Sequence, residues 1–335
     1  MLKNKKNAFI TLLSITLAVY NFINPQKQFK AAETDIQVDV YNPDKACNGT
    51  TILADNHIPE KPRVIEVDME GRIVWEYLLP AGLKRYTNPG FDVEALSNGN
   101  VLLTLPGKGL YEINREGNVV WSYLDKKVSH DADRLPNKNT LVVYGNDDTA
   151  DDAQVKEISP QGALVWTWYA KDHFYKSPYK NISRQGWTHT NAASRLTNGN
   201  TLISLRNFNI VVEVGPKGKV IRIIGQGIYN HQHDPEILPN GNILTANHGR
   251  PQAAEEMNPE TEEIIWQFAL NEPQTWPVRD ADRLTNGNTL ITGTTKIVEV
   301  TPEKEIVWQL SLKGLNFGKK DGPARGFYKA QRISP

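Results

Sequence analysis

A short segment recurs five times along the chain, and this repetition constrains the fold more than any other feature. Each copy contains a leucine, a turn rich in asparagine and glycine, and an apolar stretch of strand length. The copies are EALSNGNVLLTL from Glu94, DRLPNKNTLVVY from Asp133, SRLTNGNTLISL from Ser194, EILPNGNILTAN from Glu236 and DRLTNGNTLITG from Asp282. Self-similarity of this kind is typical of a fold built from stacked repeats.

The turn in each copy predicts a β-hairpin. An Asn-Gly pair favours a two-residue turn in which both residues have positive φ. In the copy with Asn137, Lys138 and Asn139, an asparagine is expected to take the left-handed conformation. A second apolar hairpin follows each copy and ends near a large side chain that we expect to pack between units. These residues are Trp75, Trp121, Trp166, Trp266 and Trp308, with Arg222 in the remaining unit.

Two hairpins per unit give four strands in roughly 40 residues, the size of a propeller blade. Residues 50–80 supply three strands of one unit, and residues 327–335 align with the innermost strand that this unit lacks. The sequence therefore predicts an all-β, six-bladed β-propeller with four-stranded blades, closed by pairing of the N- and C-terminal strands. The predicted blades are 50–80 with 327–335, 90–125, 129–170, 188–225, 231–270 and 277–311.

The N-terminus has the pattern of a targeting segment. Lys3, Lys5 and Lys6 precede an uncharged apolar run that begins at Ala8, so residues 1–32 are expected to be a signal peptide or an N-terminal membrane anchor. Either one predicts an extracytoplasmic domain, periplasmic or secreted, with membrane contact only through an uncleaved N-terminal segment. Residues 33–49 are expected to be a linker, followed by the propeller over residues 50–335.

Composition excludes several classes of function. The 38 basic and 38 acidic residues give no net charge, which argues against nucleic acid as a partner. The lone Cys47 excludes a disulfide within the chain and a cysteine-rich metal site. No nucleophile elbow, phosphate-binding glycine loop or dinucleotide fingerprint occurs, so no cofactor is expected. The oligomeric state stays open.

Histidines gather at equivalent positions of the predicted innermost strands. Five residues before the leucine of each turn, the row reads Phe91, His130, Asn191, His233, Arg279 and Tyr328. Seven residues before it, the row reads Pro89, Val128, His189, His231, Pro277 and Gly326. Alternate residues share one face of a strand, so we expect both rows to converge on one axial pocket suited to anion binding or acid–base chemistry.

Other polar residues surround these rows. Arg206, in the second strand of the His189 unit, would clamp a tetrahedral oxyanion with two hydrogen bonds, and His248 occupies the same column. Asp131, Asp234 and Asp280 repeat one residue after the first row. Their repetition indicates a structural role, such as accepting amide N–H groups of a neighbouring strand, with a second role in orienting the adjacent histidines.

Metal binding is a competing use of these side chains. Four histidines would suffice for zinc or copper, but His231 and His233 are the only closely spaced pair. The acidic segment 146–152 lacks the ligand spacing of a calcium loop and is interpreted as a solvated hairpin tip. We therefore expect no metal. The longest insertion, residues 171–186, is expected to overhang one mouth of the channel.

Three segments resemble the bacterial arylsulfate sulfotransferase family: 129–131 around His130, 187–191 followed by Arg206, and 232–233. The similarity covers residues 42–335 and lacks the family's N-terminal β domain. It implies a sulfuryl transfer from a phenolic sulfate ester to a phenol without a nucleotide donor. It also implies that His233 is the nucleophile, transiently sulfated. The residues implied to hold the sulfuryl oxygens and assist the leaving phenol are His130, His189, Asn191 and Arg206.

The implied partners are a small aromatic sulfate donor and a phenolic acceptor. His231, Arg279, Trp187 and Tyr328 are expected to complete the substrate-binding set, and Phe174, Tyr175 and Trp276 are further aromatic candidates. Three alternatives stay open: a non-catalytic propeller that binds a ligand or a protein, a metal-dependent lyase or hydrolase, and a quinone-dependent dehydrogenase. Six blades and the absence of paired cysteines argue against the last.

Overall fold

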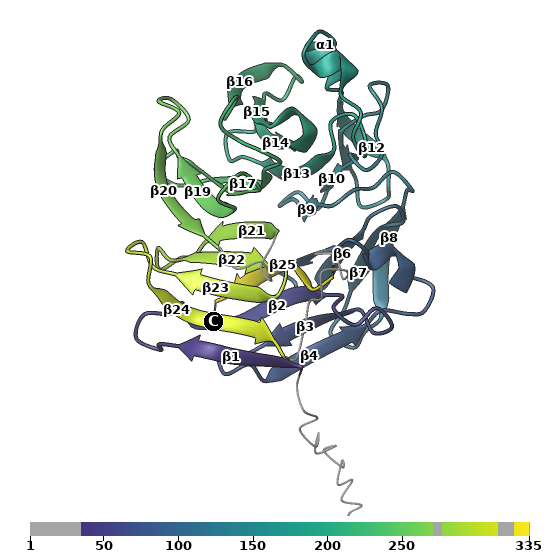
Figure 1. Cartoon of the computed structure of the whole chain (residues 1–335). Helices are drawn as coiled ribbons and strands as arrows, with labels where there is room; N and C mark the ends of the chain where they lie inside the picture. Colours follow the sequence, from purple (N-terminus) through teal and green to yellow (C-terminus); the bar gives the residue numbers. More distant parts are fainter. Residues whose placement is uncertain (1–34, 271–276, 314–324, 335) are drawn as a thin grey trace, which may run out of the picture. The chain divides into compact units, whose positions relative to one another are not determined.

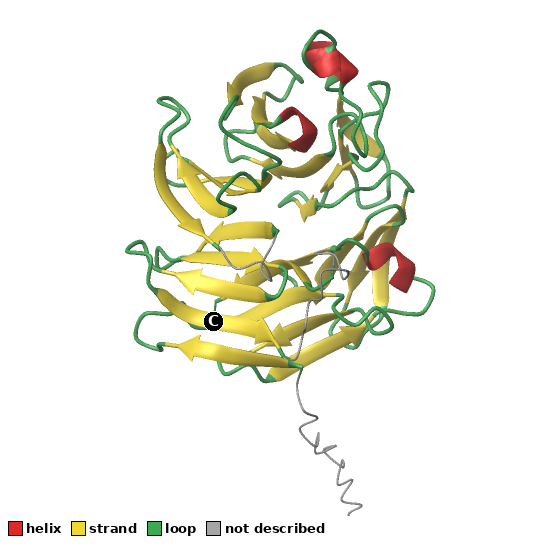
Figure 2. Cartoon of the chain, viewed as in Figure 1, coloured by secondary structure: helices red, strands yellow, loops and turns green. Residues whose placement is uncertain are grey.

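The computed structural model describes residues 35–270, 277–313 and 325–334. These residues form six antiparallel sheets arranged as the blades of a six-bladed β-propeller (Figure 1). Helix is confined to short turns, at Lys84–Thr87, Lys171–Phe174 (α1), Tyr179–Asn181 and Arg206–Phe208 (Figure 2). No helix in this part of the chain has the length and apolarity to cross a bilayer. The predicted signal or anchor segment lies outside the described residues.

Five blades are continuous in the chain, and their order from the first strand to the fourth follows the sequence. Blade 2 comprises β5 Asp92–Ala95, β6 Val101–Leu105, β7 Gly109–Ile113 and β8 Val119–Leu124. Blade 3 comprises β9 Ala132–Arg134, β10 Thr140–Val143, β11 Val155–Ile158 and β12 Leu164–Trp168. Blade 4 comprises β13 Thr190–Arg195, β14 Thr201–Leu205, β15 Ile210–Val214 and β16 Val220–Ile224. Blade 5 comprises β17 His233–Ile237, β18 Ile243–Asn247, β19 Ala253–Met257 and β20 Ile264–Ala269, and blade 6 comprises β21 Val278–Arg283, β22 Thr289–Gly293, β23 Lys296–Val300 and β24 Ile306–Leu312.

Blade 1 joins the two ends of the described chain. Its innermost strand is β25 (Phe327–Ile333), which pairs antiparallel with β2 (Thr50–Asp55), followed by β3 (Arg63–Val67) and β4 (Ile73–Leu78). The register places Thr50 opposite Ile333. The predicted closure of the ring is therefore confirmed, and it leaves β2 without a free edge.

The segment expected to be a linker contains a strand. Residues Ile36–Tyr41 form β1, which pairs with β24 and gives blade 6 a fifth, outermost strand. Ile36, Val38 and Val40 alternate with polar residues, which is the pattern of a half-buried strand. This strand does not belong to any repeat copy, so the repeat alignment did not detect it. On β24, which pairs with β1, Val307 is buried. On β8, the outermost strand of blade 2, Val120 is 53% exposed.

The repeated tryptophans link each blade to the next, as expected. The indole N–H of Trp75 donates to the carbonyl of Arg115 at 2.8 Å, and that of Trp121 donates to Pro160 at 2.7 Å. Trp166, Trp266 and Trp308 donate in the same way to Pro216, Pro302 and Met69. Arg222, which replaces the sixth tryptophan, reaches Glu260 of the following blade at 3.0 Å. Five blade interfaces thus combine aromatic packing with a satisfied indole N–H, and the sixth has an ion pair in its place.

The turns differ from the two-residue hairpins expected from the Asn-Gly pairs. The amide of Leu96 donates to the carbonyl of Asn100, and the amide of Gly99 donates to Leu96, so the loop holds three residues. Only the third loop residue has positive φ, which is 83° at Gly99. In the variant copy Lys138, and not an asparagine, takes the left-handed conformation with φ of 69°. A type I turn followed by one left-handed residue has this geometry.

An ion-pair cluster fastens the start of the described chain to blade 1. The His57 ring contacts Asp55 at 2.6 Å and Asp35 at 3.2 Å, and Arg63 contacts the same two carboxylates. Burial disfavours the charged imidazolium, but hydrogen bonds and charge from both carboxylates prevail and raise the pKa of His57 to about 9.

Replacing His57 with glutamine is therefore expected to destabilise the propeller in a pH-dependent way. A raised folded-state pKa contributes stability that is complete below the ordinary pKa of 6.5 and is lost as the pH rises through about 9. The melting temperatures of the wild type and His57→Gln should differ most near about pH 6 and converge by about pH 10. A difference that is constant over this range would show that packing, and not protonation, is what the ring contributes.

Candidate functional site

A polar cavity of about 530 Å³ lies on the propeller axis at the end where the inner strands begin. Five of the seven histidines in the chain line it, together with two arginines and a tyrosine. The lining residues are Pro89, His130, Asn146, Asp147, Gln185, His189, Arg206, His231, His233, His248, Pro277, Arg279 and Tyr328. Apart from the prolines, the two aligned rows supply six of these side chains, and the six come from five blades. Gln185 comes from the insertion expected over the channel mouth.

Irregular backbone at the start of the inner strands aims these side chains. The pairing of β13 with β14 slips between Thr190 and Ala192, and the pairing of β17 with β18 slips between His233 and Glu236. His189 and His231 have positive φ, of 47° and 52°. Bulges and left-handed residues of this kind re-aim side chains and are concentrated at functional sites.

Hydrogen bonds fix some rings and leave others free. The Nδ1 of His189 lies 2.7 Å from the carbonyl of Gln185, so it carries the proton and leaves Nε2 as an acceptor. The Nε2 of His248 lies 2.6 Å from the carbonyl of Val278, and its ring stacks on His233 at 4.4 Å between centroids. The Nε2 of His233 and the Nδ1 of His130 are buried and have no hydrogen-bond partner among the described residues.

The histidines are held in the neutral form. Burial and the charge of nearby arginines lower the pKa of His189 and of His231 to about 4. The same two causes, with a neighbouring histidine, place the pKa values of His130 and His233 well below the usual range. At neutral pH these imidazoles are therefore uncharged, and an unprotonated ring nitrogen is available as a nucleophile or an acceptor.

The positive charge of the cavity comes from two arginines. Arg206 and Arg279 are both largely buried, and neither forms an ion pair with a carboxylate in the described part of the chain. The guanidinium of Arg279 lies 4.9 Å from the centroid of the Tyr328 ring, and its Nε has no hydrogen-bond partner there. Asp147, which also lines the cavity, is exposed. Two buried, uncompensated guanidinium groups are unfavourable unless an anion joins them.

Two residues expected at the site lie beside it. Asn191 is buried, and its amide donates to the carbonyl of Gln232 at 2.9 Å while its Oδ1 has no partner among the described residues. Trp187 points into a hydrophobic cluster, where its ring packs edge-on against Phe208 with 5.1 Å between centroids. The expectation that Trp187 contacts an aryl group is therefore not met, because the reversal at His189 turns neighbouring side chains to opposite sides.

The other aromatic candidates also lie elsewhere. Phe174 belongs to the same hydrophobic cluster as Trp187, and Tyr175 is exposed. Trp276 lies outside the described residues. Tyr328 is the one aromatic candidate that lines the cavity within the described residues. Its ring lies 5.8 Å from that of His130.

The repeated aspartates behave only partly as expected. Asp131 accepts the backbone N–H of Ala193 in the next blade at 2.8 Å, which is the structural role that the repetition indicated. Asp234 instead forms an ion pair with Lys329. No described aspartate of this row accepts a hydrogen bond from a histidine ring of the cavity, so these residues do not set the orientation of the imidazoles.

Asp148 supports the site, although the sequence placed it in a solvated hairpin tip. Its buried carboxylate accepts the backbone N–H groups of Thr188 and His189 at 3.1 Å and the hydroxyl of Thr188 at 2.7 Å. Gln154 donates a further hydrogen bond at 3.1 Å. The carboxylate thereby fixes the backbone on which His189 adopts its left-handed conformation. No local motif distinguishes Asp148 from its exposed acidic neighbours.

Replacing Asp148 with asparagine is expected to cost about 1–3 kcal/mol of stability, because donors now face an amide nitrogen. Displacement of His189 should also lower turnover by about 10- to 100-fold. Thermal melting and steady-state kinetics would measure the two effects. The matched control is Asp151→Asn in the same loop, whose side chain is 92% exposed. If both substitutions lowered stability and turnover equally, the charge of the loop, and not the buried carboxylate of Asp148, would be the cause.

Comparison with known proteins identifies one sequence family. The family model described as Arylsulfotransferase (ASST) matches residues 37–231. This match covers more than half of the chain and includes His130, His189, Asn191 and Arg206, while His233 lies two residues beyond its end. No curated protein sequence is significantly similar to the chain.

Solved structures share the fold at low sequence identity. A protein of unknown function from Bacteroides caccae has a TM-score of 0.57 and 18% identity, over 84% of this chain and 98% of that one. A streptogramin B lyase has a TM-score of 0.53 and 13% identity, over 89% and 98% of the two chains. An inactive virginiamycin B lyase from Staphylococcus aureus, solved with quinupristin, has a TM-score of 0.50 and 12% identity, over 81% and 87%. These similarities concern the propeller architecture.

Proposed function

The chain belongs to the arylsulfotransferase family, and from this premise we propose that it transfers a sulfuryl group from an aryl sulfate ester to a phenol. The proposed route has two steps, with a sulfated His233 between them and no nucleotide donor. The observation that supports it most is that two largely buried guanidinium groups, neither ion-paired with a described carboxylate, lie with neutral imidazoles around one cavity.

The cavity has the charge required for the donor. A sulfate monoester carries one negative charge spread over three oxygens, and a guanidinium offers paired N–H donors to such a group. Arg206 and Arg279 would hold these oxygens, and a protonated Nδ1 of His130 would donate a further hydrogen bond to them. Transfer of a sulfuryl group resembles phosphoryl transfer, in which positioning and charge stabilisation dominate.

His233 is suited to the role of nucleophile. Its pKa is held far below the usual range by burial and by the neighbouring charges, so the ring is neutral at physiological pH. A lone pair on an imidazole nitrogen would attack sulfur as the bond to the phenolic oxygen breaks, and the phenolate would leave. An incoming phenol would then take the group from the sulfohistidine, restoring the free imidazole.

The departing phenolate needs a proton or a strong donor. Binding of an anionic ester would raise the pKa values of the adjacent His130 and His189 towards neutrality, since an opposite charge favours the protonated ring. Either ring would then protonate the leaving oxygen and, in the second step, accept the proton of the acceptor phenol. The ring of Tyr328 would lie against the aryl group.

The direct test mixes purified protein with 4-nitrophenyl sulfate and a phenol acceptor. We expect nitrophenolate release to depend on the acceptor, with parallel lines in double-reciprocal plots as for a two-step transfer. Intact mass after brief exposure to the donor alone should show one added SO₃ group. Binding of the donor without release or adduct would instead identify a non-catalytic binding propeller, and release that needs added metal would identify a metal-dependent hydrolase.

The N-terminal residues bear on the compartment in which the protein works. We propose that the propeller functions outside the cytoplasm, because Lys3, Lys5, Lys6 and the apolar run from Ala8 have the layout of an export signal. Fractionation of expressing cells, with the N-terminal sequence of the recovered protein, would distinguish a cleaved signal from an anchor.

A further inference from the structure

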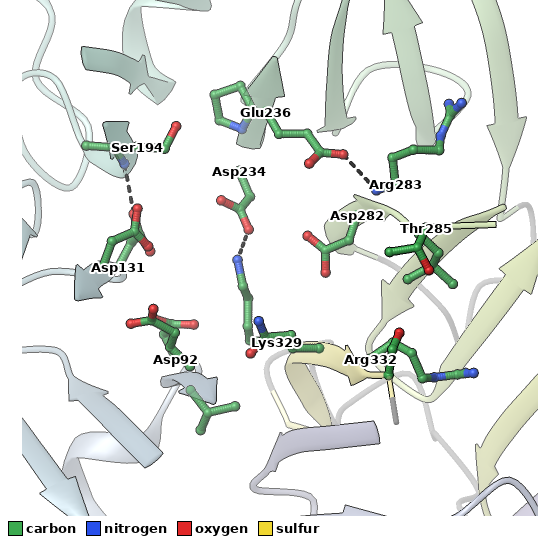
Figure 3. A pocket seen from close by; sticks show the side chains of 18 residues that line it. Asp92, Asp131, Ser194, Asp234, Glu236, Asp282, Arg283, Thr285, Lys329 and Arg332 are labelled. Atoms are coloured by element: carbon green, nitrogen blue, oxygen red, sulfur yellow. Dashed lines mark hydrogen bonds and ion pairs between the residues drawn. The ribbon is translucent and has the colours of Figure 1, made fainter. Parts of the chain in front are cut away.

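A second cavity, of about 350 Å³, lies on the axis below the histidine cavity, towards the Asn-Gly turns. We propose that this acidic part of the channel binds a calcium ion between the carboxylates of Asp234, Asp280 and Asp282. One oxygen from each lies within 4.8 Å of the others. Figure 3 shows Asp234 and Asp282 turned towards the interior of the cavity, with the side chain of Lys329 extending to Asp234.

The inner strands place carboxylates here in two rows. The row that follows the histidine row contains Asp92, Asp131, Asp234 and Asp280, and the row two residues further on contains Glu94, Asp133, Glu236 and Asp282. Three cationic side chains line the cavity among the described residues. Arg283 and Arg332 extend away to Glu256 and Glu299, at 2.7 and 3.1 Å. Lys329 is therefore the cation left to face seven lining carboxylates, and Asp280 is buried next to them.

Backbone groups satisfy some of these carboxylates but not the three proposed ligands. Asp131, Glu94 and Glu236 each accept a backbone N–H of the next blade. Asp280 is only 1% exposed, and neither of its oxygens accepts a hydrogen bond of good geometry. The amides of Ala281 and Ala330 lie near enough to lower its pKa slightly but do not pair with it. Asp282 has no hydrogen bond or ion pair with any described residue.

Lys329 does not balance this charge. Its ammonium contacts Asp234 and lies 3.5 Å from one oxygen of Asp280. The other oxygen of Asp280 and both oxygens of Asp282 have no cationic partner among the described residues. A buried carboxylate without a partner is strongly unfavourable. Burial and mutual repulsion accordingly raise the pKa values of Asp280 and Asp282 well above their usual range. A divalent cation would supply the missing charge.

The geometry favours calcium over magnesium. Calcium takes oxygen ligands at about 2.3–2.6 Å, so the span across the ion is about 4.6–5.2 Å and accommodates oxygens up to 4.8 Å apart. Magnesium demands about 2.0–2.1 Å and a regular octahedron. A carboxylate has about four lone-pair positions, so Asp234 can keep its contact with Lys329 while binding the ion. Water would complete the coordination.

The experiment titrates CaCl₂ into EDTA-treated, dialysed protein by calorimetry at about pH 7.5 and measures melting temperature with and without calcium. We expect saturable binding with one ion per chain and a rise in melting temperature. Asp282→Asn should weaken binding by at least about tenfold, whereas Asp151→Asn, which makes the same change on an exposed loop, should not. MgCl₂ should bind more weakly than CaCl₂.

Melting temperature provides a second readout. Calcium should raise the melting temperature of the wild type and of Asp151→Asn but not that of Asp282→Asn. An equal rise in all three proteins would place the ion on ordinary surface carboxylates and overturn the proposal. Absence of saturable binding to the wild type, or equal affinity of a folded Asp282→Asn, would overturn it as well and leave protons as the neutralising charge.

Discussion

His233→Ala is expected to lower the turnover of aryl sulfate by about 10⁴-fold or more, and the SO₃ adduct should disappear from the mass spectrum. The reason is that the substitution removes the proposed nucleophile, and His248, the ring stacked on it, has its Nε2 bonded to the carbonyl of Val278. Loss of a nucleophile removes the whole two-step route, so the effect is far larger than the loss of one hydrogen bond.

The control for this substitution is His173→Ala. His173 lies on α1, outside the cavity, and its ring contacts Trp168 and the carbonyl of Gly218. It should retain full turnover. A His233→Ala protein that still acquires the adduct would move the nucleophile to another ring, and His130, whose Nδ1 has no partner among the described residues, would be the first to test.

Arg206→Ala is expected to lower kcat/KM by about 10²- to 10³-fold, the usual loss when one donor to a developing oxyanion is removed. Arg206→Lys should recover only part of this loss, because an ammonium keeps the charge but not the paired donors. Steady-state kinetics with 4-nitrophenyl sulfate would measure both. Equal activity of the lysine variant and the wild type would reduce the role of Arg206 to charge alone.

The same substitution has a signature in the pH profile. Arg206 lowers the pKa values of His130, His189, His231 and His233, so its removal should raise them. The kcat/KM of the wild type, which reports the protein before the donor binds, should fall little between about pH 8 and 6, where an ordinary histidine titrates, because the rings of the free protein stay neutral. In Arg206→Ala the acidic limb should move to higher pH. An unmoved limb would show that burial and the other neighbouring charges, and not Arg206, set these pKa values.

The repeat alignment was sufficient to predict the architecture, because each copy encodes the same four strands and the same inter-blade tryptophan. It predicted the closure of blade 1 by β25 for the same reason. It did not detect β1, which belongs to no copy, and it assigned two-residue turns where the structure has three-residue loops. The difference between these turns depends on the φ of one residue, which the Asn-Gly pair does not specify.

The sequence predicted which aligned positions meet at the site, but it did not predict the contacts that their side chains form. Equal spacing from the turn brings His130, His233, Arg279 and Tyr328 together, since inner strands converge on one axis. Whether Trp187 faces the cavity depends on the reversed backbone at His189, and that reversal depends on Asp148, forty residues earlier in the chain. A local sequence pattern does not reveal a contact between residues that lie this far apart in the chain.

β25 contributes to both axial cavities, with Tyr328 in one and Lys329 in the other. A nascent chain that has not yet reached residue 333 has an open ring, and neither cavity has its full wall. Both cavities are therefore complete only after β25 has been synthesised. A nonsense mutation between codons 249 and 326 would yield a fragment that has all seven histidines but lacks β25.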